Sequence, residues 1–296
     1  MKYILAIDAG TTSNRAILFD EDGHVVTVAQ KAFKQYFPKP GWVEQDPSEI
    51  LSTTIGVVAE ALAKADIDKK DVVCMGITNQ RETTILWDKK TGRAIAPAIV
   101  WQCRRTADRA EAVKEEGYGD IVREKTGLEV DAYFSATKIG YILDSVPGAR
   151  ERAEKGEILF GTVDSFLLFH LTGGVHATDM SNASRTMLFN IHSKTWDQEL
   201  LDLLDIPREI LPEVCPSAGY FGSTSSSFLG HSLPITGVLG DQQAALFGQS
   251  CLEAGEAKAT YGTGAFVLMN TGPDPIISKN GLLTSIAWDI KGQTSY

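Results

Sequence analysis

The sequence predicts an α/β fold built around a mixed β-sheet. Three short apolar runs at residues 3–7, 15–19 and 25–29 are separated by turns, which is the pattern of a β-meander. The second of these turns, at residues 20–23, carries the Asp-Gly sequence that favours a hairpin. Farther along the chain, runs of strand type alternate with stretches whose apolar residues recur at the helical period. Helices are therefore expected beside the sheet.

The first helix is predicted to begin after Asp46. Asp46 suits the N-cap, Pro47 suits the first helical position, and Glu49 completes the pattern of a capping box. Apolar residues between 50 and 62 then recur near a period of 3.6. Residues 222–233 are rich in Ser and Gly and are expected to form an exposed loop. The same criteria predict strands at 72–77, 84–87, 158–162 and 235–239, and helices at 106–116, 135–144, 196–204 and 244–249.

Composition places the chain among ordinary globular proteins. Its 296 residues are 43% hydrophobic and 22% charged, which excludes a disordered or fibrous chain. With 28 Lys and Arg against 38 Asp and Glu, the net charge is −10, and an acidic surface argues against nonspecific nucleic-acid binding. No apolar stretch is long enough to span a membrane. The four cysteines form no CxxC pair, which favours a reduced, cytoplasmic protein.

Two segments far apart in the chain are similar to each other. Residues 4–12 and 257–264 each have the pattern of a strand followed by a Gly-Thr turn, and more strand follows each turn. The match predicts a duplicated fold with one phosphate-facing hairpin in each half, and a second domain that begins near residue 252. Because the match is short, chance similarity is the alternative.

The turn at residues 8–13 is the first candidate site. It lacks the glycine spacing of a P-loop or of a dinucleotide-binding turn, and a strand follows where those motifs need a helix. Its backbone N–H groups and three hydroxyls are still able to hold a polyphosphate. Asp8 is suited to Mg²⁺, usually through water, and Arg15 is suited to the phosphates. The alternative is a plain β-turn capped by Asp and Thr.

Two further segments carry groups suited to an alcohol substrate. Asp241 follows an apolar strand, where its carboxylate is able to accept a proton from a hydroxyl that attacks phosphorus. The alternative for Asp241 is a helix N-cap. Arg81 and Glu82 are suited to grip neighbouring hydroxyls, and the alternative for them is a surface ion pair. Aromatic residues at 101 and 133–134 are candidates either for the wall of a small polar pocket or for the core.

A set of segments spread along the chain matches one known pattern. They are Asp-x-Gly-Thr-Thr-Ser-x-Arg at 8–15, Pro-Gly-Trp-Val-Glu-Gln-Asp-Pro at 40–47, Gly-Ile-Thr-Asn-Gln-Arg-Glu-Thr-Thr at 76–84, Ile-Val-Trp-Gln-Cys-Arg-Arg-Thr at 99–106, Asn-Ala-Ser-Arg-Thr-Met at 182–187, Gly-Asp-Gln-Gln-Ala-Ala-Leu-Phe-Gly-Gln at 240–249 and Thr-Tyr-Gly-Thr-Gly at 260–264. Together they resemble the glycerol kinases of the FGGY carbohydrate kinase family, within which the Arg-Glu pair at 81–82 marks the glycerol kinases.

The resemblance implies a ribonuclease H-like fold of the actin, Hsp70 and hexokinase type, with the site in a cleft between two domains. It assigns residues 1–251 to the glycerol-binding domain and 252–296 to the beginning of the nucleotide domain, which is incomplete where the chain ends. It implies a glycerol site made of Arg81, Glu82, Trp101, Tyr133, Asp241 and Gln242, with Asp241 as the catalytic base. It places Thr11, Thr12, Ser13, Arg15, Thr263 and Gly264 at the phosphates of ATP, and Asp8 at Mg²⁺.

The implied reaction transfers the γ-phosphate of ATP to glycerol and gives ADP and glycerol 3-phosphate. Such a transfer asks the protein mainly for alignment and charge neutralisation. The protein is expected to be a homo-oligomer at full length. Three other interpretations stay open: a kinase for another polyol or sugar, an actin-like protein that uses ATP as a conformational switch, and a fragment that binds glycerol without turnover.

Overall fold

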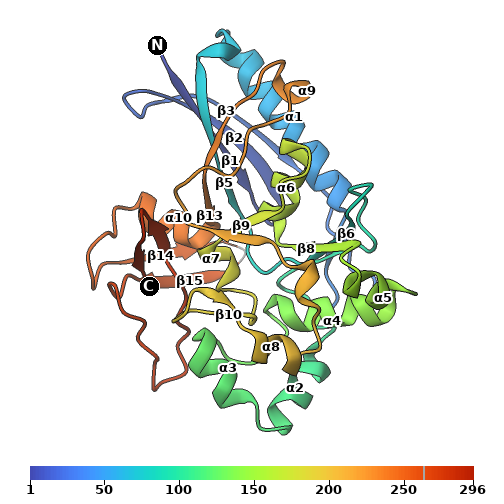
Figure 1. Ribbon diagram of the computed structural model, residues 1–296. Coiled ribbons are helices and arrows are strands. Elements are labelled where there is room, and N and C mark those ends of the chain that lie inside the picture. Colours follow the sequence, from blue (N-terminus) through green and yellow to red (C-terminus); the bar gives the residue numbers. More distant parts are fainter. Residues whose placement is uncertain (263) are drawn as a thin grey trace.

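A five-stranded mixed sheet forms the upper half of the molecule as drawn in Figure 1. The computed structural model describes residues 1–262 and 264–296, so the predicted phosphate contact of Thr263 lies outside the described residues. The strands are β1 (Tyr3–Ala9), β2 (Ser13–Asp20), β3 (Val25–Ala32), β5 (Val72–Asn79) and β13 (Ile235–Gly240). The first three form the predicted antiparallel meander, while β5 pairs with β1, and β13 with β5, in parallel. The mixed sheet is confirmed.

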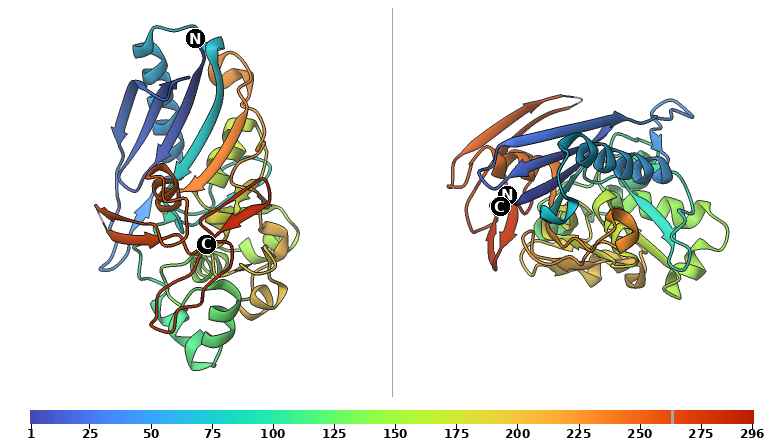
Figure 2. Two further views of the ribbon diagram at one scale, coloured as in Figure 1. Left: turned by 90° about the vertical axis from the view of Figure 1, so that its left-hand side faces the viewer. Right: turned by 90° about the horizontal axis from the view of Figure 1, so that it is seen from above.

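Two helices cover one face of this sheet, α1 (Pro47–Ala65) and α6 (Val163–Thr172) (Figure 2). Side chains of β1 alternate across the sheet, so that Leu5 and Ile7 are buried beneath α1. The Asp46 side chain caps α1 by accepting a hydrogen bond from the Ser48 N–H, as predicted. The capping box is wrong, because the Glu49 carboxylate accepts a hydrogen bond at 3.2 Å from the backbone N–H of Lys34.

Short helices and strands form a lobe below the sheet, with a second hydrophobic core (Figure 1). The helices are α2 (Ala107–Glu115), α3 (Gly119–Thr126), α4 (Ser135–Ser145), α5 (Ala149–Glu154), α7 (Met180–Ala183) and α8 (Gln198–Leu203). The strands are β4 (Glu44–Gln45), β6 (Ile85–Asp88), β7 (Ala98–Ile99), β8 (Ile158–Gly161), β9 (Ala177–Asp179), β10 (Phe189–Asn190), β11 (Thr195–Trp196) and β12 (Glu213–Cys215). The predicted strands and helices of this region appear with their ends shifted by one or two residues.

The expected exposed loop at 222–233 is wrong in part. The segment contains the one-turn helix α9 (Ser226–Leu229), and it closes on itself through backbone hydrogen bonds. The Thr224 N–H donates to the Leu233 carbonyl at 2.9 Å, and the Leu233 N–H donates to the Thr224 hydroxyl at 3.0 Å. Both residues are buried, because these hydrogen bonds satisfy the backbone away from water.

The last part of the chain carries the second hairpin, β14 (Ala257–Tyr261) and β15 (Ala265–Met269), which pair antiparallel as predicted. Two short strands follow, β16 (Trp288–Ile290) and β17 (Gln293–Ser295), and they pack back against the first part of the chain. The proposed domain boundary at residues 251 and 252 therefore stays a prediction. Among the described residues, no helix combines the length and apolar character that crossing a membrane requires.

Candidate active site

The turn after β5 buries two charged residues side by side. Arg81 is 5% exposed and Glu82 is 1% exposed, so the surface ion pair considered for them is not what forms. Each charge takes a different partner. The Arg81 Nε donates to the Asp241 Oδ1 at 2.9 Å, although 160 residues separate them in the chain. Glu82 adopts a positive φ of 60°, a strained conformation for this residue and one that clusters at functional sites.

The partner of Glu82 is Arg185, which the sequence analysis did not single out. The Arg185 Nε donates to the Glu82 Oε1 at 2.6 Å, and the Arg185 side chain is 6% exposed. Its guanidinium also lies over the rings of Tyr133 and Phe134, at 5.4 and 5.0 Å from their centroids. A buried glutamate needs a cation, so the arginine in the 182–187 motif was the signal in the sequence from which this partner could have been predicted.

Asp241 is the first residue of α10 (Asp241–Gly248), directly after β13. Gly240 is the N-cap and Asp241 is the first helical residue, so the N-cap interpretation is wrong. The Asp241 Oδ1 instead accepts a hydrogen bond from the backbone N–H of Gln242 at 2.7 Å. Burial raises the pKa of the Asp241 carboxyl, Arg81 opposes this rise, and the charge of Glu82 adds to it. The raised pKa makes the carboxylate more basic than usual. It is also accessible, because 31% of its side chain is exposed.

Three aromatic rings stand around these charges. Trp101 contacts Tyr133 edge to face, with ring centroids 5.7 Å apart, and contacts Phe266 in the same way at 5.9 Å. Phe266 also lies 5.6 Å from the Arg81 guanidinium. The sequence analysis expected the first two rings but not Phe266, which comes from the second hairpin. Trp101 joins the two hairpins, because its Nε1 donates to the Thr11 hydroxyl at 3.0 Å.

The predicted residues of the first hairpin are exposed in whole or in part. Thr12 and Arg15 are exposed, and the Ser13 hydroxyl accepts a hydrogen bond from the side chain of Gln30. Arg15 lies 3.4 Å from the carboxylate of Asp8. Burial raises the pKa of Asp8, Arg15 lowers it, and the charge of Asp241 raises it further. The Asp241 carboxylate is therefore close enough to Asp8 to affect its pKa.

The second hairpin is tied to α10 by Lys258. The Lys258 ammonium donates to the side chain of Gln242 and, at 2.8 Å, to the hydroxyl of Thr260. Burial and the nearby Arg81 lower the pKa of Lys258 to about 8. At Gly264, an added Cβ would lie 2.7 Å from the ring of Phe266, so a larger residue there would have to displace this ring.

Two buried glutamines connect the first hairpin to the turn after β5. The Gln45 Nε2 donates to the Thr11 carbonyl at 2.8 Å, and its Oε1 accepts from the Gln80 Nε2 at 2.8 Å. The Gln80 Oε1 in turn accepts from the Thr83 hydroxyl at 2.9 Å. This amide chain fixes Thr11 relative to Arg81, because Gln80 directly precedes that arginine in the sequence.

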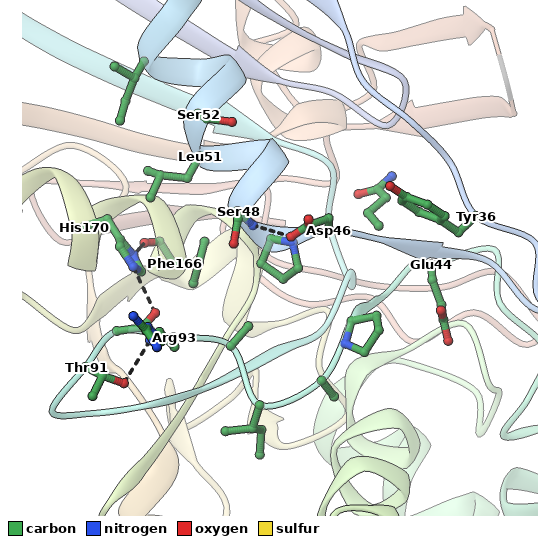
Figure 3. Close-up of a pocket in the computed structure, with 18 residues that line it drawn as sticks. Tyr36, Glu44, Asp46, Ser48, Leu51, Ser52, Thr91, Arg93, Phe166 and His170 are labelled. Carbon is green, nitrogen blue, oxygen red and sulfur yellow. Dashed lines mark hydrogen bonds between the residues drawn. The ribbon is translucent and has the colours of Figure 1, made fainter.

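A separate cavity of about 770 Å³ lies between the start of α1 and the loop at residues 91–97 (Figure 3). His170 borders it and holds that loop, because its two ring nitrogens face the carbonyls of Phe166 and Gly92 at 2.9 and 3.0 Å. Figure 3 shows Ser48 and Asp46 at the opposite wall. The cavity is lined by none of the predicted site residues.

One group of possible metal ligands gathers at the far end of β2 from this site. Asp20, Asp22 and His24 bring their ligand atoms within 4.8 Å of one another. The Asp20 Oδ1 accepts hydrogen bonds from the backbone N–H groups of Asp22 and His24, so the cluster is explained by a capped hairpin turn.

Comparison with known proteins identifies the family. Residues 3–248 match the N-terminal domain of the FGGY family of carbohydrate kinases. The chain is 59% identical over its full length to the glycerol kinase of Agathobacter rectalis and 58% identical to glycerol kinase 2 of Thermotoga maritima. It spans 59% and 60% of the length of these two relatives.

Solved structures agree with the expected fold. The glycerol kinase of Plasmodium falciparum with ADP superposes with a TM-score of 0.93 at 36% identity, over the whole of this chain and 60% of that one. A gluconate kinase from Lactobacillus acidophilus gives 0.88 at 22% identity, over the whole of this chain and 58% of that one, which bears on the fold alone. The expected actin- and hexokinase-type fold is thus confirmed. The chain belongs to the FGGY family of carbohydrate kinases.

Proposed function

We propose that this chain carries the acceptor site and the catalytic base of a kinase that transfers the γ-phosphate of ATP to glycerol. The observation that carries the proposal is the contact between Arg81 and Asp241 at 2.9 Å, beside the buried Glu82 and beneath the aromatic rings. This arrangement brings hydrogen-bond donors, an acceptor and a base close together. The identity to named glycerol kinases supports glycerol as the acceptor.

Each group has a distinct part in the proposed reaction. Arg81 and Glu82 bind two neighbouring hydroxyls of glycerol, with Gln242 as a further contact, and Trp101 and Tyr133 cover the carbon chain. Asp241 accepts the proton of the terminal hydroxyl as that oxygen attacks phosphorus, and burial favours this role by making the carboxylate more basic. Removing this proton at the moment of attack is the main chemical task left to the protein, since phosphoryl transfer depends largely on alignment.

The phosphates of ATP are proposed to lie between the two hairpins. Thr11, Thr12, Ser13 and Arg15 approach them from the first hairpin and Gly264 from the second, and Thr263 is included as a prediction. The half-buried carboxylate of Asp8, near that of Asp241, is suited to Mg²⁺ because hard cations prefer carboxylate oxygens. When bound, Mg²⁺ would supply charge neutralisation at the phosphates. A homo-oligomer at full length also stays a prediction.

Titration of the isotope-labelled chain with glycerol tests acceptor binding directly. We expect the largest NMR shifts at Arg81, Glu82 and Asp241. In a coupled assay for glycerol-dependent ADP release, Asp241→Asn should lower turnover by orders of magnitude while much of the glycerol affinity is kept, whereas Glu60→Gln on the exposed side of α1 should change neither. Glycerol shifts scattered away from the three residues would reject the assigned site.

The other interpretations predict different outcomes of the same assays. A kinase for another polyol or sugar would release ADP faster with that acceptor than with glycerol. An actin-like ATP switch would hydrolyse ATP without any dependence on glycerol. A fragment without turnover would bind glycerol and release no ADP. The buried Arg81–Glu82 turn favours a polyol kinase over the nucleotide switch, because a switch needs no groups that bind a polyol.

A further inference from the structure

We propose that the rings of Trp101 and Tyr133 separate the glycerol site from an outer subsite that fits polyols longer than three carbons. The inference rests on the proposed function and concerns what limits the length of the acceptor. A cavity of about 600 Å³ is lined by both rings, whereas Arg81, Glu82 and Asp241 do not border it. The two rings, with Phe134 beside them, therefore form the surface that the glycerol site and this cavity share.

The two rings are held in place from opposite sides. The Trp101 Nε1 donates to the Thr11 hydroxyl at 3.0 Å, and the Tyr133 backbone N–H donates to the Asp131 Oδ1 at 2.7 Å. Tyr133 also lies beneath the Arg185 guanidinium on the side of the charged site. The rings are in edge-to-face contact at 5.7 Å and form the wall between site and cavity, with the Trp101 ring and the Tyr133 backbone each held by a hydrogen bond.

The rim of the outer cavity suits an uncharged chain of hydroxyls. The Arg104 Nη1 lies 2.5 Å from the Asp131 Oδ1, and Glu129 is paired with Arg123 at 2.9 Å. Paired charges offer both donors and acceptors while leaving little net field, which argues against a phosphorylated or carboxylated ligand. The Gln102 amide, which also lines the cavity, adds one more donor and acceptor.

The far wall is a segment of the chain that is tied down at both ends. Arg123 donates to the Ser278 carbonyl, and the Thr284 N–H donates to the Gly127 carbonyl at 2.8 Å. In Figure 1 this segment descends from β15 beside α3 and returns toward the C-terminus. Leu283, between the two anchors, lines the cavity and is 41% exposed. The cavity is therefore bounded by anchored chain on both sides.

The cavity has more than enough room for the extra carbons of a longer acceptor. Each added CHOH group is comparable in size to a water molecule, which occupies about 30 Å³, so two more groups need on the order of 60 Å³. The length limit in the wild-type chain then comes from the ring wall, and removing one ring should join the two spaces.

Calorimetric titration with glycerol and with xylitol, a five-carbon polyol, tests this. The ratio of the xylitol Kd to the glycerol Kd should fall at least tenfold in Tyr133→Ala relative to wild type. If that variant does not fold by circular dichroism, Trp101→Leu opens the same wall and is judged by the same ratio. An unchanged ratio in a folded variant would overturn the proposal.

A second substitution locates the gained space. Leu283→Trp, placed on the far wall in the Tyr133→Ala background, should return the ratio toward its wild-type value by filling the cavity. If xylitol binding persists at full strength, the longer chain lies elsewhere and the subsite is rejected. Wild-type chain that binds no glycerol would count against the proposed function, whereas glycerol binding with an unmoved ratio counts against the subsite alone.

Discussion

Replacing Arg185 with methionine should destabilise the chain strongly, because it leaves the Glu82 carboxylate without its cation. Glu82 and Arg185 are 1% and 6% exposed, and their atoms lie 2.6 Å apart. Breaking a buried pair by removing one partner costs about 3–5 kcal/mol. A second estimate of the destabilisation agrees. A proton would remove the unpaired charge, and protonating an ordinary glutamate at pH 7 costs about 4 kcal/mol. In melting temperature this corresponds to a drop of about 10 °C.

Urea denaturation followed by tryptophan fluorescence measures this effect at pH 7 and at pH 5. A carboxyl that takes up a proton on folding gains stability as the pH falls, so Arg185→Met should lose about 1 kcal/mol at pH 5 by the same proton cost. The double variant Glu82→Gln/Arg185→Met, which strands no charge, is the matched control and should be more stable at pH 7 than the single variant. A single variant that loses less than 1 kcal/mol at pH 7, or that equals the double variant, would refute the reasoning.

Three further perturbations test the packing and the buried polar groups. Gly161→Ala should lower the free energy of unfolding by about 1–3 kcal/mol, because its Cβ would meet the Cβ of Ser165. Gly56→Ala, inside α1 with open space around it, should raise the free energy of unfolding by about 1 kcal/mol. Equal urea midpoints would contradict both predictions. Burial lowers the pKa of His176 to about 4, so only the unfolded chain takes up that proton between about pH 6.5 and 4. The free energy of unfolding should therefore decrease as the pH is lowered across that window. His176→Phe should flatten this dependence in denaturation experiments at a series of pH values. Gln45→Met should cost about 1–3 kcal/mol by calorimetry, since it strands buried amide and carbonyl groups, and a neutral result would show that water replaces it.

The secondary structure that could be predicted from the sequence is the part governed by neighbours in the chain. Strands β1 and β2 show the alternation of one buried face, and the cap at Asp46 depends on the next two residues only. The helix α6 was missed because it is apolar on nearly every side, so it carries no helical period. The capping box failed because Lys34, fifteen residues away, offers a competing N–H to Glu49.

The candidate site was likewise predictable from the sequence only in part. The motifs pointed to Arg81, Glu82, Trp101, Tyr133 and Asp241 as residue types suited to a polyol and a phosphate. Their charged partners were not predictable, because a residue's type does not state which distant charge will neutralise it. The assignment of roles to these residues stays a proposal until binding and turnover are measured.

The sequence by itself determined the mixed sheet, the two Gly-Thr hairpins and the family, since short-range patterns and motifs are written in consecutive residues. Only the tertiary structure decided that Arg81 contacts Asp241 across 160 residues, that Arg185 neutralises Glu82 across 103, and that Phe266 completes the aromatic wall. The physical reason is that burying a charge is costly without a partner, and the chain meets that requirement through folding geometry that no local pattern records.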